Sequence, residues 1–202
     1  MSVHENQPVL EAGQDIRGAD KVVIMLHGRG ATAESILQLS DKLPEAAYLA
    51  PQAAGREWYP RSFMEPRESN QPHLDSALEL VDSMVEDAAE QVGVENVYLL
   101  GFSQGACLAS EYVVSHPDRY GGLMVLSGGL IGEKVQKFEG NLEGTQAFIG
   151  CSDSDPHIPL ERVDETEKVL DKLNADVEKY IMKGSHHGIV EYEVEKIKEM
   201  LE

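Results

Sequence analysis

The sequence lacks several features that mark specialised classes of protein. It contains only two cysteines, Cys107 and Cys151, which cannot form a framework of disulfide bonds. No apolar run approaches the roughly 20 residues that a membrane-spanning helix needs. The first residues have neither the basic region nor the apolar core of a signal peptide. We therefore expect a cytoplasmic protein with two buried, reduced thiols and no membrane insertion.

Basic residues are also scarce. The chain has 17 Lys and Arg against 36 Asp and Glu, and its formal net charge is −19. Such a surface repels the phosphates of nucleic acids and of anionic membranes, which excludes both as partners. A strongly solvated surface explains the charge, and adaptation to high salt is the alternative explanation. Neither explanation indicates a function.

Short apolar runs typical of strands alternate with amphipathic helical patterns along the chain. Strands are expected at residues 9–10, 21–26, 47–50, 97–100, 122–127, 145–150 and 177–182. Helices are expected at residues 32–43, 74–92, 104–116, 160–173 and 190–201. This alternation implies an α/β fold with a mostly parallel sheet and helices on both faces. Because there is no linker and no repeat, the sequence predicts a single domain over residues 1–202.

The most informative stretch joins one of these strands to the helix that follows. Gly101-Phe102-Ser103-Gln104-Gly105 is a G-x-S-x-G pentapeptide, which can form a sharp turn with the serine in a strained backbone state. Glycine is needed two residues to either side because a Cβ there would collide with the neighbouring strand or helix. The turn also places the serine at a helix N-terminus, which favours developing negative charge. We therefore predict that Ser103 is a nucleophile rather than part of a surface turn.

A serine nucleophile needs a base within hydrogen-bond reach and a carboxylate that orients this base. In a parallel sheet these groups follow the carboxyl ends of strands, in the chain order serine, acid, histidine. Asp153 and Asp155 follow the next-to-last expected strand, and His186 and His187 follow the last one. The residues alone do not decide which of the two aspartates is the acid or which of the two histidines is the base.

The longest irregular segment, residues 52–72, contains Trp58, Tyr59 and Phe63. Long loops in compact domains are usually functional or disordered, and this aromatic content argues against disorder. We predict that the three aromatic side chains wall an acyl or aromatic pocket, with burial in the core as the alternative.

The histidines and carboxylates near the last two strands could also be considered as metal ligands. Their spacing does not form a metal-binding motif such as HExxH. We expect neither a metal nor another cofactor.

Six segments taken together resemble a known family. They are Leu26-His27-Gly28-Arg29-Gly30, Ala50-Pro51-Gln52, Gly101-Phe102-Ser103-Gln104-Gly105-Ala106, Leu126-Ser127-Gly128-Gly129, Asp155-Pro156-His157-Ile158-Pro159 and His187-Gly188-Ile189. Their order and spacing resemble the carboxylesterase/phospholipase family of α/β-hydrolases, which includes the acyl-protein thioesterases. The resemblance runs from about residue 20 to the C-terminus. It implies an α/β-hydrolase fold, and no insertion is long enough to form a separate lid domain.

The resemblance also selects among the open alternatives. The acid of the family begins an Asp-Pro-x-x-Pro segment, which implies Asp155, and its histidine stands two residues before an isoleucine, which implies His187. The oxyanion would be held by the backbone N–H groups of Gln104, the residue after the nucleophile, and Arg29. Since these donors are backbone groups, their side chains are expected to be free to vary.

By this resemblance the protein is a serine carboxylesterase or thioesterase that acts on a small-molecule ester or thioester through an acyl-serine. The family often forms homodimers, so a second copy of the chain is a further expected partner. Three alternatives use the same fold: a lysophospholipase, a hydrolase of C–C bonds and a ligand-binding protein with low turnover.

Overall fold

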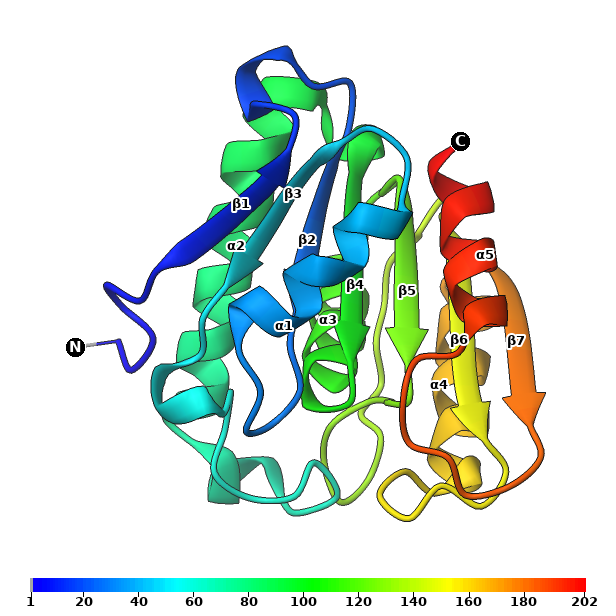
Figure 1. Ribbon diagram of the computed structural model, residues 1–202. Helices are drawn as coiled ribbons and strands as arrows, with labels where there is room; N and C mark the ends of the chain where they lie inside the picture. The colour runs from blue at the N-terminus through cyan, green and yellow to red at the C-terminus, as the bar shows by residue number, and fades with distance from the viewer. Residues whose placement is uncertain (1) are drawn as a thin grey trace.

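The computed structural model describes residues 2–202 and is built on a seven-stranded sheet (Figure 1). The strands are β1 (Val9–Gly13), β2 (Val22–Leu26), β3 (Ala47–Pro51), β4 (Val97–Phe102), β5 (Gly122–Leu126), β6 (Gln146–Ser152) and β7 (Asp176–Met182). Their order across the sheet is β1-β3-β2-β4-β5-β6-β7. β1 is antiparallel to β3, and the other neighbouring strands are parallel. The predicted fold class is thus confirmed.

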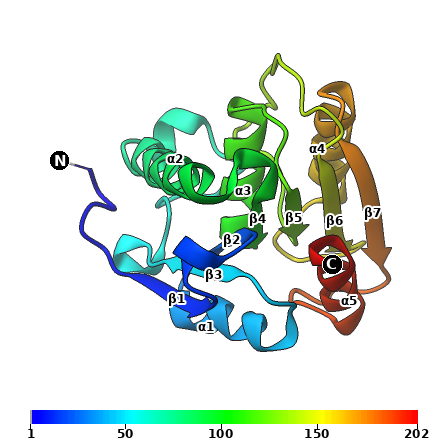
Figure 2. The same cartoon turned by 90° about the horizontal axis from the view of Figure 1, so that it is seen from above.

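Helices cover both faces of this sheet, as the view from above shows (Figure 2). One face carries α2 (His73–Val92), α3 (Gln104–Ser115) and α4 (Leu160–Lys172), and the other carries α1 (Ala33–Leu37) and α5 (Glu191–Leu201). The sheet therefore separates two apolar cores. β2 is inaccessible to solvent along its whole length, as an apolar strand covered on both faces should be.

The first helix is shorter than its apolar pattern predicted. α1 ends at Leu37, and the chain continues as a 3₁₀ helix over Gln38–Lys42. The Ser40 hydroxyl donates to the Leu37 carbonyl (2.7 Å), a local bond that competes with the regular helical pattern. Pro44 then disfavours a helical Leu43, which is extended. The apolar periodicity located the packed face of this segment but not the end of its helix.

No helix within residues 2–202 combines the length and the apolar character needed to cross a membrane. Both cysteines are buried as free thiols, as the sequence predicted.

α5 carries a buried carboxyl group over β6. Glu193 is inaccessible to solvent; its Oε2 accepts a hydrogen bond from the Val190 amide (2.9 Å), whereas its Oε1 has no partner within residues 2–202. A Cβ added to Gly150 would lie 2.1 Å from Oε1, so the carboxyl packs directly over that glycine. Burial raises the pKa of Glu193 to about 7 because the charged form is poorly solvated there.

The raised pKa predicts that Glu193 lowers stability above neutral pH. In the folded state the Glu193 carboxyl keeps its proton up to about pH 7, whereas a glutamate in the unfolded chain releases its proton at about pH 4.3. The carboxyl group therefore makes its full contribution to the free energy of folding at pH values below its pKa in the unfolded state. This contribution is lost as the pH rises through its pKa in the folded state. Glu193→Gln keeps an acceptor for the Val190 amide and cannot ionise. We expect it to raise the free energy of unfolding by about 3.5 kcal/mol at pH 8 and to change it little at pH 4.5.

Urea denaturation at several pH values measures this difference. Glu195→Gln, at an exposed position of the same helix, is the matched control and should change stability little at either pH. A Glu193→Gln effect of equal size at both pH values would contradict the role given to ionisation.

Candidate active site

Ser103 lies in the turn between β4 and α3, with a backbone φ of 54° and ψ of −117°. Non-glycine residues rarely adopt a positive φ, and the strain persists only where the surroundings enforce it. Here two glycines bring the backbones together. A Cβ on Gly101 would lie 2.2 Å from the Gly105 carbonyl oxygen, and one on Gly105 would lie 2.0 Å from the Leu26 carbonyl oxygen. The G-x-S-x-G spacing therefore has the steric cause inferred from the sequence.

The carboxyl ends of the strands bring Ser103, His187 and Asp155 together. Ser103 Oγ is 2.9 Å from His187 Nε2, and His187 Nδ1 is 2.7 Å from Asp155 Oδ2. The Asp155 side chain is completely buried, and the imidazole is 18% exposed. Asp155 Oδ1 accepts hydrogen bonds from the His157 and Ile158 amides at 2.8 and 3.0 Å. The backbone thus fixes the carboxylate, the carboxylate orients the imidazole, and the imidazole faces the hydroxyl.

The other acid and histidine that the sequence left open contribute to the loops instead. Asp153 Oδ1 accepts from the Gly184 amide (3.0 Å), and the Asp153 amide donates to the Met182 carbonyl (2.8 Å). The Ser152 hydroxyl donates to the His186 carbonyl. These bonds join the loop after β6 to the loop after β7, so Asp155 and His187 are held in one unit.

The rings of Phe102 and His157 lie beside the His187 ring, a contact that the sequence analysis did not predict. The centroid of His187 is 5.1 Å from that of Phe102 and 4.8 Å from that of His157. Phe102 stands directly before the nucleophile, and this position was the only clue to its contact. Within residues 2–202, no cluster of three or more His, Cys, Asp or Glu residues is arranged to hold a metal ion.

Gln104 is next to Ser103 in the chain, whereas Arg29 follows Gly28, which lies close to Ser103 in space. Gln104 follows Ser103, and a Cβ on Gly28 would lie 3.4 Å from the Ser103 Cβ. As the first residue of α3, Gln104 has no intrahelical acceptor for its N–H. Among the backbone hydrogen bonds of residues 2–202, neither amide is a donor. Neither N–H group therefore has a backbone acceptor within the described residues.

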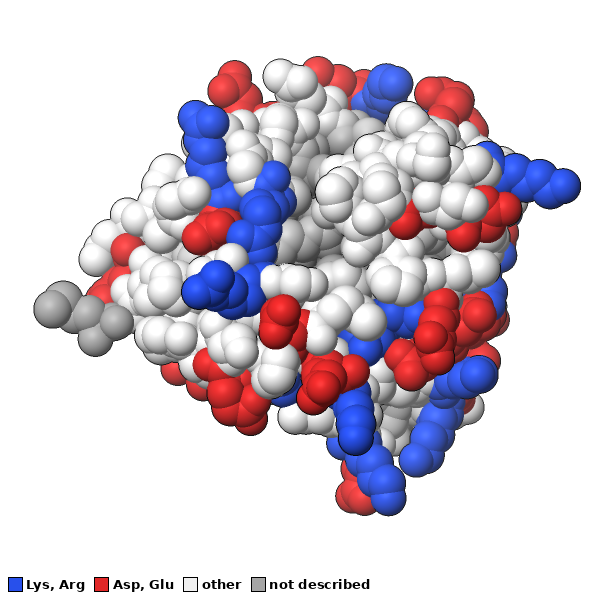
Figure 3. Space-filling view, turned by 90° about the horizontal axis from the view of Figure 1, so that it is seen from below, with Lys and Arg blue, Asp and Glu red and all other residues white. Residues whose placement is uncertain are grey.

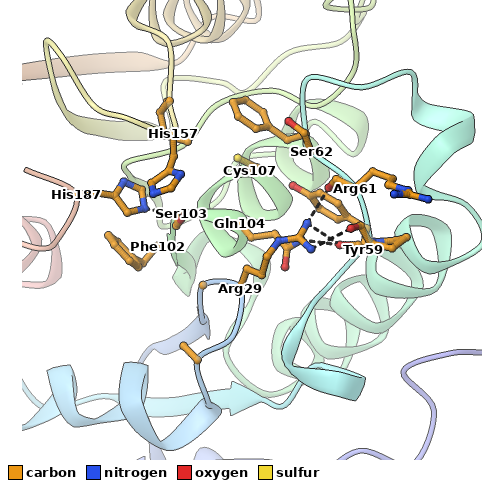
Figure 4. A pocket seen from close by; sticks show the side chains of 15 residues that line it. Arg29, Tyr59, Arg61, Ser62, Phe102, Ser103, Gln104, Cys107, His157 and His187 are labelled. Atoms are coloured by element: carbon orange, nitrogen blue, oxygen red, sulfur yellow. Dashed lines mark hydrogen bonds between the residues drawn. The ribbon is translucent and has the colours of Figure 1, made fainter. Parts of the chain in front are cut away.

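The side chains of the same two residues hold the loop at residues 57–61, contrary to the expectation that they are free to vary. The Arg29 guanidinium pairs with Glu57 (2.7 Å) and donates to the carbonyls of Tyr59, Pro60 and Arg61 at 2.7 to 3.0 Å (Figure 4). Gln104 Oε1 accepts from the amide at position 58, and its Nε2 donates to the carbonyl at position 59, both at 2.8 Å. The sequence analysis assigned a role only to the backbone amides of these two residues, and a residue of any type carries such an amide.

A cavity of about 680 Å³ opens next to Ser103 and is visible as the hollow in Figure 3. Tyr59 and Phe63 line it, as do Ile158 and Cys107. Trp58 does not, which corrects its predicted place in the wall.

The Trp58 ring points to the core side of the loop and is inaccessible to solvent. Its Nε1 donates to the His27 carbonyl (2.8 Å), and its centroid is 5.0 Å from that of the His27 ring. All three aromatic side chains belong to the buried core, and Tyr59 and Phe63 also line the cavity.

Comparisons with known proteins indicate the family of this chain. The family model for phospholipase/carboxylesterase matches residues 7–202. A crystal structure of a phospholipase/carboxylesterase from Dyadobacter fermentans is 40% identical, with a TM-score of 0.95, and the match covers 100% of this chain and 99% of that one. The putative hydrolase MhqD of Bacillus subtilis is 27% identical over 90% of this chain and 92% of its own length. Acyl-protein thioesterase 1 of Kluyveromyces lactis is 32% identical over 49% of this chain and 45% of its own length, so that match spans about half of either protein.

The family model covers nearly the whole chain, and the similar crystal structure has the same fold over its full length. The relatives are described as esterases, thioesterases or hydrolases. The chain therefore belongs to the phospholipase/carboxylesterase family of α/β-hydrolases, a family of carboxylic ester hydrolases.

Proposed function

We propose that the protein hydrolyses small carboxylic esters or thioesters through an acyl-serine intermediate on Ser103. The observation that carries this proposal is the continuous hydrogen-bonded chain from the Ser103 hydroxyl through His187 to the buried Asp155 carboxylate. The adjoining cavity, of about 680 Å³, has the size of a small-molecule site.

The hydrogen bonds support a proposed role for each group. Asp155 accepts the Nδ1–H of His187, which leaves the Nε2 lone pair directed at Ser103. His187 takes the hydroxyl proton while Ser103 Oγ attacks the carbonyl carbon of the substrate. The buried carboxylate stabilises the resulting imidazolium. The imidazolium then passes the proton to the alcohol or thiol that leaves, and the acyl group stays on the serine.

The Arg29 and Gln104 amides are the proposed donors to the oxyanion, and each would contribute about 3 kcal/mol to the stability of the transition state. Deacylation repeats the sequence with water. His187 removes a proton from the water molecule, the hydroxide oxygen attacks the acyl carbon, and the proton returns to Ser103 Oγ as the acid departs. The chain itself supplies every group that these steps use.

Removal of the nucleophile should abolish turnover. We expect Ser103→Ala to lower kcat by about 10⁶-fold on p-nitrophenyl esters, because the acyl-enzyme cannot form. Release of p-nitrophenol from a series of short to long acyl esters, by the wild type and the variant, measures this effect. A wild type that is slow on every ester and matched by the variant would contradict the proposed function and favour a binding protein or a C–C hydrolase.

The acid can be tested against its neighbour in the same loop. Asp155→Asn should lower kcat by about 10⁴-fold, because an amide can place an N–H opposite Nδ1 and favour the wrong tautomer of His187. Asp153→Asn is the matched control and keeps an oxygen for the Gly184 amide, so its kcat should stay within a few-fold of the wild type. Steady-state kinetics with one ester suffice for both variants. The reverse order of losses would move the acid to position 153.

A further inference from the structure

One histidine that lines the cavity has no role in the proposed mechanism. His157 is exposed and contributes to the cavity wall. Its backbone amide donates to Asp155 Oδ1 (2.8 Å), but its ring nitrogens bind no other residue among residues 2–202. A neutral imidazole donates a hydrogen bond from one ring nitrogen and accepts one at the other. The ring is thus available to a molecule bound in the cavity.

The segment around His157 is held at several points. The amide bond to Asp155 ties it to a carboxylate that is itself completely buried. Pro156 and Pro159 fix the backbone φ at two positions of the segment, and the Ile158 side chain between them is buried. A substrate therefore meets an imidazole whose backbone is already in place.

The His157 ring lies beside the ring of His187. Their centroids are 4.8 Å apart and their planes are inclined by 63°, and Figure 4 shows both rings on the same side of Ser103. His187 Nε2, which is 2.9 Å from Ser103 Oγ, is the nitrogen that passes the proton to the leaving atom in the proposed mechanism. The leaving atom must come within hydrogen-bond reach of Nε2, on the side of the cavity that His157 lines.

A second donor at this place would act on the transition state. As the bond from the acyl carbon to the leaving oxygen or sulfur breaks, negative charge develops on that atom, and a donor directed at developing charge lowers the barrier. Within residues 2–202, no Asp or Glu lines the cavity. The leaving atom therefore meets no carboxylate in the wall that would repel its charge or compete for the His157 N–H.

We propose that His157 is a further catalytic residue, whose imidazole N–H donates a hydrogen bond to the departing oxygen or sulfur while His187 protonates it. The N–H proton stays on His157, and the proton that reaches the leaving atom is the one that His187 took from Ser103. The hydrogen bond matters most for alkyl alcohols and electron-rich phenols, because their charge is concentrated on the departing atom. This inference rests on the proposed acyl-serine chemistry.

Two acetate esters with leaving groups of similar size test the inference. The p-nitrophenoxide ion spreads its charge into the nitro group, whereas p-methoxyphenoxide keeps its charge on oxygen. The measured quantity is the ratio of kcat/KM for p-methoxyphenyl acetate to kcat/KM for p-nitrophenyl acetate. His157→Leu should lower this ratio roughly tenfold, because the concentrated charge loses a hydrogen-bond donor. The intrinsic reactivities of the two esters cancel when the variant is compared with the wild type.

Two further variants serve as controls. His157→Gln returns an N–H donor to the position and should recover part of the ratio. His186→Leu makes the same change at an exposed histidine in the loop that carries His187, at a position that does not line the cavity. It should leave the ratio unchanged. The Tm of each variant measures any effect on stability separately.

Three outcomes would overturn the inference. Equal losses on both esters in His157→Leu would show that the ring only shapes the cavity, and would leave the proposed function intact. A fall of the same size in the His186→Leu ratio would assign the effect to the loop and not to the His157 N–H. A wild type no faster than Ser103→Ala on both esters would overturn the proposed function, and this inference with it.

Discussion

The close approach of α3 to the central strands is the constraint on which the site depends. It is possible only because Gly101 and Gly105 have no Cβ: the Cβ missing from Gly105 would lie 2.0 Å from the Leu26 carbonyl oxygen. The contact turns the chain sharply enough to hold Ser103 at a positive φ. It also places the start of α3 beside the loop after β2, so the two proposed oxyanion amides come from different segments and meet at one serine.

Once α3 is fixed, one stripe of its side chains holds two loops, one of which lines the cavity. Gln104, Cys107 and Glu111 are spaced three and four residues apart and so lie on the same helical face. Gln104 binds the backbone at positions 58 and 59, and Cys107 accepts the Gly129 amide. The buried Glu111 pairs with Arg67 and accepts the Ile131 amide (3.1 Å). Two loops that are distant in sequence are thus anchored to the helix that carries the nucleophile.

Local patterns were enough to predict the strands, most helices and the serine turn. Apolar periodicity reports which face of a segment is packed, and the glycine spacing around Ser103 reports a steric requirement within five residues. The residues alone could not separate Asp153 from Asp155, because both follow the same strand and differ only in where the side chain points. The resemblance to a family made that choice, and it is Asp155 that lies against His187.

What the sequence did not reveal depends on contacts between distant segments. No local pattern shows that the Arg29 guanidinium donates hydrogen bonds to the carbonyls of residues 59–61. Nor does one show that Tyr59 lines the cavity while the buried Trp58 does not.

The two sides of the cleft are built from separate pieces of chain. The loop at residues 57–61, held by Arg29 and Gln104, walls the side away from His187. The joined loops after β6 and β7 carry Asp155 and His187. The wall and the His187–Asp155 pair are thus held by different hydrogen bonds, so the loop can change in shape while the pair stays in place.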